Sequence, residues 1–385
     1  MDFASTTPVD PEVLAEMLPY FLNYYGNPSS LHQIGRKAKE AVSNARKTVS
    51  SILNCTENEI VFTSGGTESD NIAILGHALY LSKQRSTGIF ACSEIEHHAI
   101  INSIYATKQY GFEPFLLPVN RKGIVNLKAL ENLILSKKVC LVSIMYANNE
   151  IGTIQPINKI AKLCRKNSVV FHTDACQASP YLSLDVKKLG IDMMSLNGSK
   201  MYGPKGVGLV YIKKATSISQ VVYGGGQEKG IRSGTENVPG VVGLAKALSL
   251  AQSNISIECE KETKLRDKLI TNLLDIPKVV LNGSKEERLP NNVNLSFLGV
   301  EGEAMLLELD KCGICVSTGS ACSSNSLEPS HVILAIHKDD SNPHSYAHSS
   351  IRFTIGKYTT EEEIEYTILR VREILTRLRS ISSTW

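Results

Sequence analysis

The chain has 385 residues, of which 42% are hydrophobic and 21% are charged, and its formal net charge is +3. This composition is typical of a globular protein of roughly two to three domains. Lysine and arginine are scattered along the chain and no apolar run could span a bilayer, so we expect neither nucleic acid nor a membrane as a partner.

The first half of the chain alternates strands with helices. Residues 10–21 and 30–53 have helical spacing, residues 59–63 are typical of a strand, and a helix begins near Thr67. Further strands are predicted at 88–92, 114–119, 139–146, 169–176 and 191–197, with helical stretches between them. This alternation predicts an α/β fold with a mostly parallel sheet covered on both faces.

The pattern changes after residues 207–213. Helices are predicted at 238–253, 257–274, 302–311 and 360–380, and strands at 278–281, 292–297 and 351–355. We therefore predict a large domain over residues 1–255 and a smaller α+β domain over residues 256–385. Residues 1–15 could pack against the smaller domain.

Lys200 follows an apolar run, residues 191–196, that predicts a buried strand. Gly198 before it and Gly203-Pro204 after it favour tight turns. A lysine held there is well placed to form a Schiff base, because burial lowers its pKa and frees the amine. The alternative is a surface turn that carries Lys200 and Lys205, and this stretch alone favours that alternative.

Ser64-Gly65-Gly66-Thr67 lies between a predicted strand and the start of a helix. The two glycines allow a ligand close to the backbone, and free N–H groups at a helix start favour an anion, with phosphate the natural one. An ordinary turn is an equally good interpretation of this stretch. The motif matches neither the Walker loop nor the dinucleotide fingerprint.

Asp174 and His97 each follow a predicted strand. A buried aspartate needs a cationic partner, and a protonated pyridine nitrogen would serve. His97 could stack on an aromatic ring and move protons. The alternatives are a helix cap for Asp174 and a surface or cap position for His97.

Cys322 lies among small residues at 317–326. A flexible chain of that length spans about 17 Å on average, which suits a loop that presents a thiol, although a tight turn is the alternative. Most of the nine cysteines lie in apolar runs, as Cys92 and Cys140 do, and this is typical of reduced thiols. With no basic, apolar leader before residue 3, we expect a cytoplasmic protein, or an organellar matrix protein if the chain is processed.

Two further features complete the candidate residues. Cys312, Cys315 and Cys322 are close in sequence, but no other pair with metal-site spacing completes them, so no metal site is predicted. We expect packing to hold Cys312 and Cys315.

Arg352 lies in a predicted strand, where either a substrate carboxylate or a structural salt bridge would pair with it.

Together these stretches resemble cysteine desulfurases of the NifS/IscS type, within the class V aminotransferase family and the fold-type I pyridoxal-phosphate enzymes. The resemblance covers almost the whole chain. Its motifs are GNPSS at 26–30, SGGTE at 64–68, ANNEIG at 147–152, DACQ at 174–177, KMYGPKG at 200–206, RSGT at 232–235 and SAC at 320–322.

The resemblance implies that pyridoxal 5′-phosphate is the cofactor. It would be bound covalently by Lys200, paired at the ring nitrogen by Asp174 and stacked upon by His97. The remaining implied cofactor contacts are Asn149 and Gln177 at the ring hydroxyl, Gly66 and Thr67 at the phosphate, and Thr235 from the partner subunit of a homodimer.

The substrate roles are also implied by the resemblance. Arg352 and Asn27 would hold the carboxylate of L-cysteine, and Cys322 would take the substrate sulfur as a persulfide while L-alanine forms. His97 is a plausible helper in making the Cys322 thiolate. The acceptor would be an iron–sulfur scaffold protein, with a possible transient cluster contact through Cys322.

One departure from the family pattern precedes the lysine. The family usually has a histidine there, whereas this chain has Ser199, with Asn197 two residues earlier. Both side chains can still donate hydrogen bonds to a phosphate.

The alternatives to a desulfurase are a selenocysteine lyase or cysteine sulfinate desulfinase, whose cysteine loops tend to be shorter, and a cofactor-poor sulfur-carrying scaffold.

Overall fold

The computed structural model describes residues 1–318 and 328–381. Its larger part is organised around a seven-stranded sheet of order β1-β7-β6-β5-β4-β2-β3. The strands are β1 (Ile60–Thr63), β2 (Ile89–Ser93), β3 (Glu113–Leu117), β4 (Val139–Ser143), β5 (Val170–Asp174), β6 (Met193–Asn197) and β7 (Gly208–Ile212). Pairs from β3 to β6 are parallel, and β7 is antiparallel to both β6 and β1, which confirms the mostly parallel sheet.

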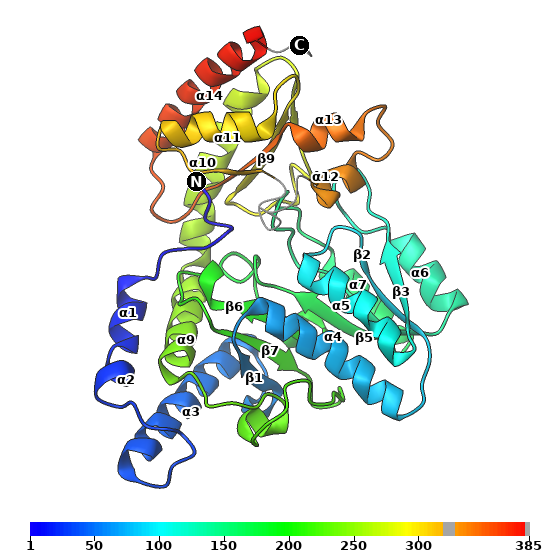
Figure 1. Cartoon of the computed structure of the whole chain (residues 1–385), viewed down its shortest axis with the longest axis vertical. Helices are drawn as coiled ribbons and strands as arrows, with labels where there is room; N and C mark the ends of the chain where they lie inside the picture. Colours follow the sequence, from blue (N-terminus) through cyan, green and yellow to red (C-terminus); the bar gives the residue numbers. More distant parts are fainter. Residues whose placement is uncertain (319–327, 382–385) are drawn as a thin grey trace.

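Helices cover both faces of this sheet (Figure 1). On one face α4 (Gly66–Lys83) and α5 (His98–Ala106) pack against side chains such as Phe90 and Leu141. The other face is covered by α3 (Gln33–Leu53), α6 (Leu127–Ser136), α7 (Ile157–Lys166), α8 (Val186–Leu189) and α9 (Val238–Ser253). Because alternate strand residues are buried on opposite faces, the strands read as continuous apolar runs.

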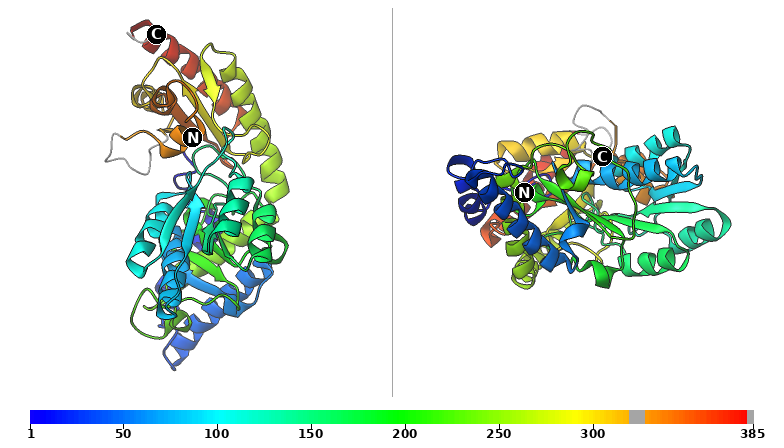
Figure 2. Two further views of the ribbon diagram at one scale, coloured as in Figure 1. Left: turned by 90° about the vertical axis from the view of Figure 1, so that its right-hand side faces the viewer. Right: turned by 90° about the horizontal axis from the view of Figure 1, so that it is seen from below.

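A second, antiparallel sheet of order β10-β11-β9-β8 forms the smaller part. Its strands are β8 (Val279–Leu281), β9 (Asn292–Phe297), β10 (Ser317–Thr318) and β11 (Ser350–Thr354). Helices α10 (Ile255–Leu274), α11 (Gly302–Lys311) and α14 (Glu361–Ile381) bury a separate core against it. Only Asn254 separates α9 from α10, so these two helices lead from one part to the other (Figures 1 and 2).

Several elements differ from the prediction. The helix expected at 10–21 is two helices, α1 (Pro11–Met17) and α2 (Pro19–Leu22), because proline favours a helix start. The expected strands 139–146 and 169–176 end at Ser143 and Asp174, where the chain leaves the ladder. Sequence patterns did not predict the short α12 (His331–Ile336), α13 (Pro343–His348) and β10, or the 3₁₀ turns η1 (Glu57–Glu59), η2 (Thr107–Tyr110), η3 (Gly198–Lys200) and η4 (Gln227–Gly230).

The first ten residues run between the two parts, as the position of the N-terminus in Figure 2 shows. The backbone N–H of Phe3 donates to the carbonyl of Thr354 in β11, and that of Thr7 donates to the carbonyl of Ser199 after β6. The segment therefore links the smaller sheet to the turn that carries Lys200. Among the described helices, none combines the length and apolar character that crossing a membrane requires.

Candidate functional site

A cavity of about 270 Å³ lies at the carboxyl ends of the parallel strands. In open α/β sheets this edge is where ligands bind. Residues from the larger part, the N-terminal segment and β11 all contribute. The lining residues are Ala4, Ser5, Gly66, Thr67, Asp70, His97, Met145, Ala147, Asn149, Asp174, Cys176, Gln177, Asn197, Lys200 and Arg352.

Lys200 extends into this cavity from the last position of η3, directly after β6. Its Nζ donates to the carbonyl oxygens of Ala4 at 3.0 Å and Ser5 at 2.5 Å. The turn is tight because a Cβ on Gly198 would lie 2.8 Å from the carbonyl oxygen of Pro204. Lys200 is therefore in the cavity rather than in a surface turn, whereas Lys205 is exposed.

Asp174 ends β5 and is 8% exposed. Its Oδ1 accepts the backbone N–H of Cys176 at 2.9 Å, which fixes the carboxylate at the cavity wall. A buried carboxylate here favours a cationic ligand atom. The geometry combines the two interpretations of the sequence, because Asp174 both caps the following turn and faces the cavity.

A buried polar network lies behind Asp174. The Nδ1 and Nε2 atoms of His172 lie 2.8 Å from Ser143 Oγ and 3.0 Å from Ser195 Oγ. Asp70 Oδ1 is 3.9 Å from His172 Nε2 and has no hydrogen-bond partner. Burial, with Asp174 nearby, raises the pKa of Asp70 well above its usual value, and burial lowers that of His172 to about 4. Burial thus disfavours the charged form of both side chains behind Asp174.

The start of α4 forms the anion-binding end of the cavity. Gly65 caps this 18-residue helix at φ 155° without a side-chain hydrogen bond, so the first N–H groups stay available. A Cβ on Gly66 would lie 2.8 Å from Cys176 Sγ, so only glycine fits there. Gly66 and Thr67 thus form a cradle of the kind that a phosphate requires.

His97 lies at the N-terminus of α5 and lines the cavity. Its Nδ1 accepts the backbone N–H of Ala99 at 3.1 Å, and burial lowers its pKa. The ring is therefore neutral with its proton on Nε2, from which it can only donate. The help of His97 in forming the Cys322 thiolate stays a prediction, because Cys322 lies outside the described residues.

Three further predicted residues are in the cavity wall. Gln177 donates from Nε2 to the carbonyl of Ala4 at 2.9 Å, and Asn149 lines the cavity beside Arg352. Asn197 Oδ1 accepts from both the N–H and the Oγ of Ser199 at 3.2 Å. Ser199 is 9% exposed and lies behind Asn197, outside the lining set.

Arg352 projects from β11 into the cavity and is 3% exposed. Its Nη2 donates to Asp2 Oδ1 and Ser5 Oγ at 2.8 Å, and its Nη1 donates to the carbonyl of Asn149 at 3.0 Å. Its Nε has no hydrogen-bond partner. Arg352 therefore has a structural partner and a remaining donor, so both interpretations of its role retain support.

The structure does not bring every predicted residue to the cavity. Asn27 and Thr235 are exposed and outside the lining set. Cys322 falls at 319–327, outside the described residues. Cys315 is exposed, so the expectation that packing holds it is wrong: Ile314 and Val316 are buried, and alternation along the chain turns Cys315 to solvent.

Sequence reasoning missed Asp70 and the carbonyl groups of Ala4 and Ser5. Asp70 comes one turn after the Gly65-Gly66 cradle on α4, and that helical spacing was the available signal. The carbonyl contacts carried no side-chain signal. It also missed Glu96, which is fully buried beside Ser93 and the backbone of Met145, and whose pKa burial raises to about 8.

The cavity fits pyridoxal phosphate. The glycine cradle at a helix start suits the phosphate, the buried Asp174 carboxylate suits a pyridinium nitrogen, and the amine of Lys200 lies between them in the same cavity. No group of three or more His, Cys, Asp or Glu side chains within the described residues could hold a metal ion.

Comparisons with known proteins agree with this geometry. Residues 1–367 match the family described as Aminotransferase class-V. The chain is 48% identical over 388 residues to cysteine desulfurase IscS of Clostridium botulinum, covering 100% of this chain and 96% of that protein. It is 44% identical over 389 residues to the cysteine desulfurase of Homo sapiens, covering 100% and 83%. A solved structure named NifS-like protein aligns with a TM-score of 0.90 and 36% identity, covering 98% of this chain and 99% of that one.

Proposed function

The chain belongs to the class-V aminotransferase family and is a pyridoxal-phosphate-dependent cysteine desulfurase, and we propose a role in this reaction for each residue of the cavity. The single observation that supports these roles is that one cavity is lined by Lys200, Asp174, Gly66 and Arg352. When bound, the cofactor supplies an electron sink for the bond changes at the substrate.

The charge or hydrogen-bonding capacity of each lining residue indicates which part of the cofactor or substrate it binds. The first N–H groups of α4, with Gly66 and Thr67, hold the phosphate, and Asp174 keeps the proton on the ring nitrogen. Arg352 binds the substrate carboxylate through the planar donors of its guanidinium, which lines the cavity. We assign Asn149, Gln177 and Asn197 to the ring hydroxyl and phosphate sides, and Asn27 to the substrate, as expected from the sequence.

The proton roles follow from position. Lys200 Nζ removes the α proton of the substrate and returns one, because Lys200 lines the cavity from the end of η3. His97 stacks on the ring and donates from Nε2. Burial disfavours the charged forms of Asp70 and His172, which lie behind Asp174.

Cys322 accepts the sulfur. Its thiolate attacks the substrate sulfur, an S–S bond forms, the C–S bond breaks, and the electron pair stays on the carbon, which takes a proton to give the methyl group of L-alanine. Support comes from the flanking residues. Ser317 pairs with Arg352 in the small sheet, and His331 Nε2 lies 3.0 Å from the carbonyl of Glu96, so both flanks lie beside the cavity.

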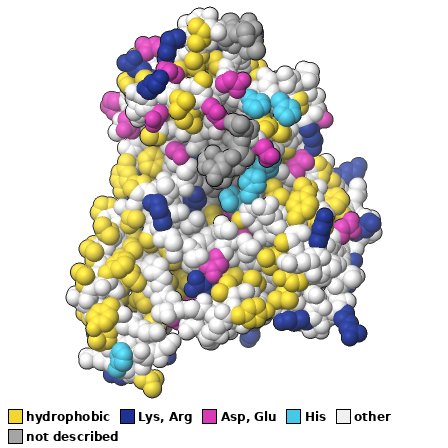
Figure 3. Space-filling model, in the orientation of Figure 1, with side chains coloured by type: hydrophobic (Ala, Val, Ile, Leu, Met, Phe, Trp, Pro, Cys, Tyr) yellow, Lys and Arg dark blue, Asp and Glu magenta, His cyan; other side chains and the backbone are white. Residues whose placement is uncertain are grey.

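A homodimer is the proposed assembly. Thr235 is outside the cavity of its own chain, which is what a contribution to the partner's phosphate site requires. An apolar surface over α1, α2 and the following loop supports it (Figure 3). Its exposed residues are Leu14, Leu18, Phe21, Leu22, Tyr24, Tyr25, Leu31 and Ile34.

The persulfide then passes to an acceptor, for which we propose an iron–sulfur scaffold protein. The eight described cysteines carry no disulfide, which supports a reducing compartment such as the cytoplasm or an organellar matrix.

The test is the product balance of the cofactor-loaded enzyme. With L-cysteine and a reductant, alanine and sulfide should form in equal amounts, and the Cys322→Ser variant should release no sulfide while keeping its cofactor. Cys315→Ser is the matched control, because Cys315 is exposed and nearby in sequence. Faster turnover of selenocysteine or cysteine sulfinate than of cysteine, or full sulfide release by Cys322→Ser, would contradict the assignment.

A further inference from the structure

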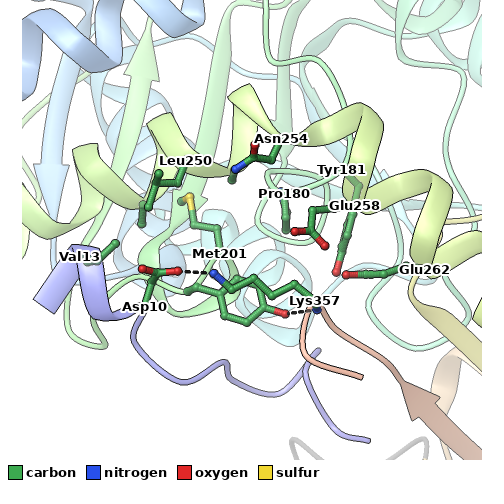
Figure 4. Close-up of a pocket in the computed structure, with 13 residues that line it drawn as sticks. Asp10, Val13, Pro180, Tyr181, Met201, Leu250, Asn254, Glu258, Glu262 and Lys357 are labelled. Carbon is green, nitrogen blue, oxygen red and sulfur yellow. Dashed lines mark hydrogen bonds and ion pairs between the residues drawn. The ribbon is translucent and has the colours of Figure 1, made fainter. Parts of the chain in front are cut away.

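A second cavity, of about 50 Å³, lies on the other side of the turn that follows Lys200 (Figure 4). Met201 and Tyr202 form one wall, Tyr181 from the loop after β5 forms another, and Glu258 and Glu262 of α10 close it. The sequence analysis did not single out any of these residues. We call this space the acidic cavity.

Glu262 is a buried carboxylate that lacks a partner. It is 1% exposed, and neither Oε1 nor Oε2 accepts a hydrogen bond from a described residue. Figure 4 shows its carboxylate turned toward the end of the Tyr181 ring. A buried carboxylate that is neither paired nor hydrogen-bonded costs folding free energy, so we expect a ligand to bind beside it.

The cations near the acidic cavity are already engaged. Lys357 forms an ion pair with Asp10 and lies 4.6 Å from the centre of the Tyr202 ring. Lys261 donates its ammonium protons to the carbonyl of Lys357. Neither Glu258 nor Glu262 takes part in an ion pair among the described residues. When Glu262 is ionised, the cavity therefore carries more negative than positive charge.

The walls favour an organic cation over a metal ion. No group of three or more His, Cys, Asp or Glu side chains in the described part of the chain could hold a metal. Much of the remaining wall is apolar: the rings of Tyr181 and Tyr202 and the thioether of Met201 line it together with aliphatic side chains such as Leu250. The Tyr202 ring already faces the ammonium of Lys357, as expected for cation–π contacts.

We propose that the acidic cavity binds a small organic ammonium ion. Its N–H group faces the Glu262 carboxylate, and its carbon atoms lie against Met201 and the tyrosine rings. Such a ligand would sit two residues from Lys200 without entering the catalytic cavity, since the two cavities share no lining residue.

Binding is linked to pH. Burial raises the pKa of Glu262 to about 8; the adjacent Tyr181 hydroxyl and Lys261 oppose the rise, and Glu258 adds to it. The other facing groups are Tyr181 and Tyr202, whose pKa values burial raises well above their usual value, and the Asp10–Lys357 pair. Because the ammonium ion needs an ionised Glu262, its affinity should rise about tenfold per pH unit below that pKa.

The test uses the cofactor-loaded enzyme and trimethylammonium chloride, a tertiary amine that cannot form an imine with an aldehyde cofactor. Calorimetric titration at constant ionic strength, between about pH 6 and pH 8.5, should show saturable binding that tightens as pH rises. Potassium and sodium chloride should bind at least about tenfold more weakly. The visible absorption of the cofactor should stay unchanged.

The matched variants are Glu262→Gln and Glu260→Gln. Glu262→Gln should weaken binding by at least about tenfold, because it removes the charge and keeps the shape. Glu260 pairs with Lys264 on the exposed side of the same helix, so Glu260→Gln should bind as the native protein does. Native affinity in Glu262→Gln, tighter binding of potassium, or no binding of the amine would each overturn the proposal. If Glu262→Gln does not fold, the pH dependence of the native protein decides, and a flat profile overturns it.

Discussion

The catalytic cavity and the acidic cavity flank the same short turn and differ in how they treat charge. The first carries both signs, from Asp174, Lys200 and Arg352, and its amine and guanidinium donate to carbonyl and carboxylate oxygens of the N-terminal segment. The second carries the carboxylates of Glu258 and Glu262 with no cation of their own. Opposite signs within one site suit acid–base chemistry, whereas unbalanced charge suits the binding of a counter-ion.

Removing charge should therefore have opposite consequences in the two cavities. In the catalytic cavity it should abolish or slow the reaction. In the acidic cavity it should leave the reaction in place and raise stability when no cation is bound. The following variants test this difference.

The largest effect is expected for Lys200→Ala. Without its amine the enzyme loses both covalent attachment of the cofactor and the group that moves the α proton, so activity should be abolished while the fold persists. Borohydride reduction followed by peptide mapping checks the attachment site. Lys205→Ala is the control, because Lys205 is exposed in the same turn. A reduced adduct on Lys205 would show that the lysine assignment is wrong.

Asp174→Asn should lower kcat by several orders of magnitude while the cofactor stays bound, because the ring nitrogen loses the carboxylate that keeps it protonated. Steady-state kinetics with cofactor titration measures both quantities. Asp185→Asn is a matched helix-cap control, since Asp185 caps α8 away from the cavity. Equal, small losses in the two variants would mean that Asp174 is only a cap.

Arg352→Lys should raise KM for cysteine by about tenfold to a hundredfold, with a smaller change in kcat. Lysine keeps the charge but cannot hold Asp2, Ser5 and a substrate carboxylate together with a planar set of donors. Initial rates over a range of cysteine concentrations separate the two parameters. An unchanged KM with a lowered melting temperature would assign Arg352 to structure alone.

Glu262→Gln should have the smallest effect of the four variants, and it should stabilise the protein rather than impair it. A carboxyl whose pKa is raised to about 8 binds its proton more tightly in the folded than in the unfolded chain, so native stability falls as pH rises from about 4.5 to 8. The variant should lose that part of the pH dependence and be more stable at pH 9 by about 1–2 kcal/mol. Thermal unfolding without added amine measures it, and Glu260→Gln should follow the native curve.

The two cavities also differ in what the sequence could reveal. Lys200, Asp174 and the Gly65-Gly66 cradle follow apolar strand runs directly, so both their place at the sheet edge and their chemistry could be predicted. Glu262 lies in a helix with charged neighbours, where a single buried carboxylate has no local signal. Its cavity depends on Tyr181 and Tyr202, which only the tertiary fold brings to α10.

The elements of the fold also differ in how well the sequence predicts them. Apolar runs predicted the strands of both sheets apart from β10, while strand ends and short helices depended on tertiary contacts. The approach of residues 1–7 to Lys200 and Arg352 was not predictable, because backbone carbonyls make most of those contacts. Asn27 and Thr235 stay predictions that the contacts of one chain do not test.

The account rests most directly on Cys322 as the residue that takes the sulfur. A single turnover of the cofactor-loaded enzyme with L-cysteine, without reductant, followed by alkylation, digestion and mass spectrometry, locates the transferred sulfur. We expect one additional sulfur on Cys322 and none on the exposed Cys315, and because no Lys, Arg or aromatic residue separates the two, fragment spectra of their shared peptide place it. Alanine formed with the extra sulfur on Cys315, or with no protein persulfide at all, would contradict the account.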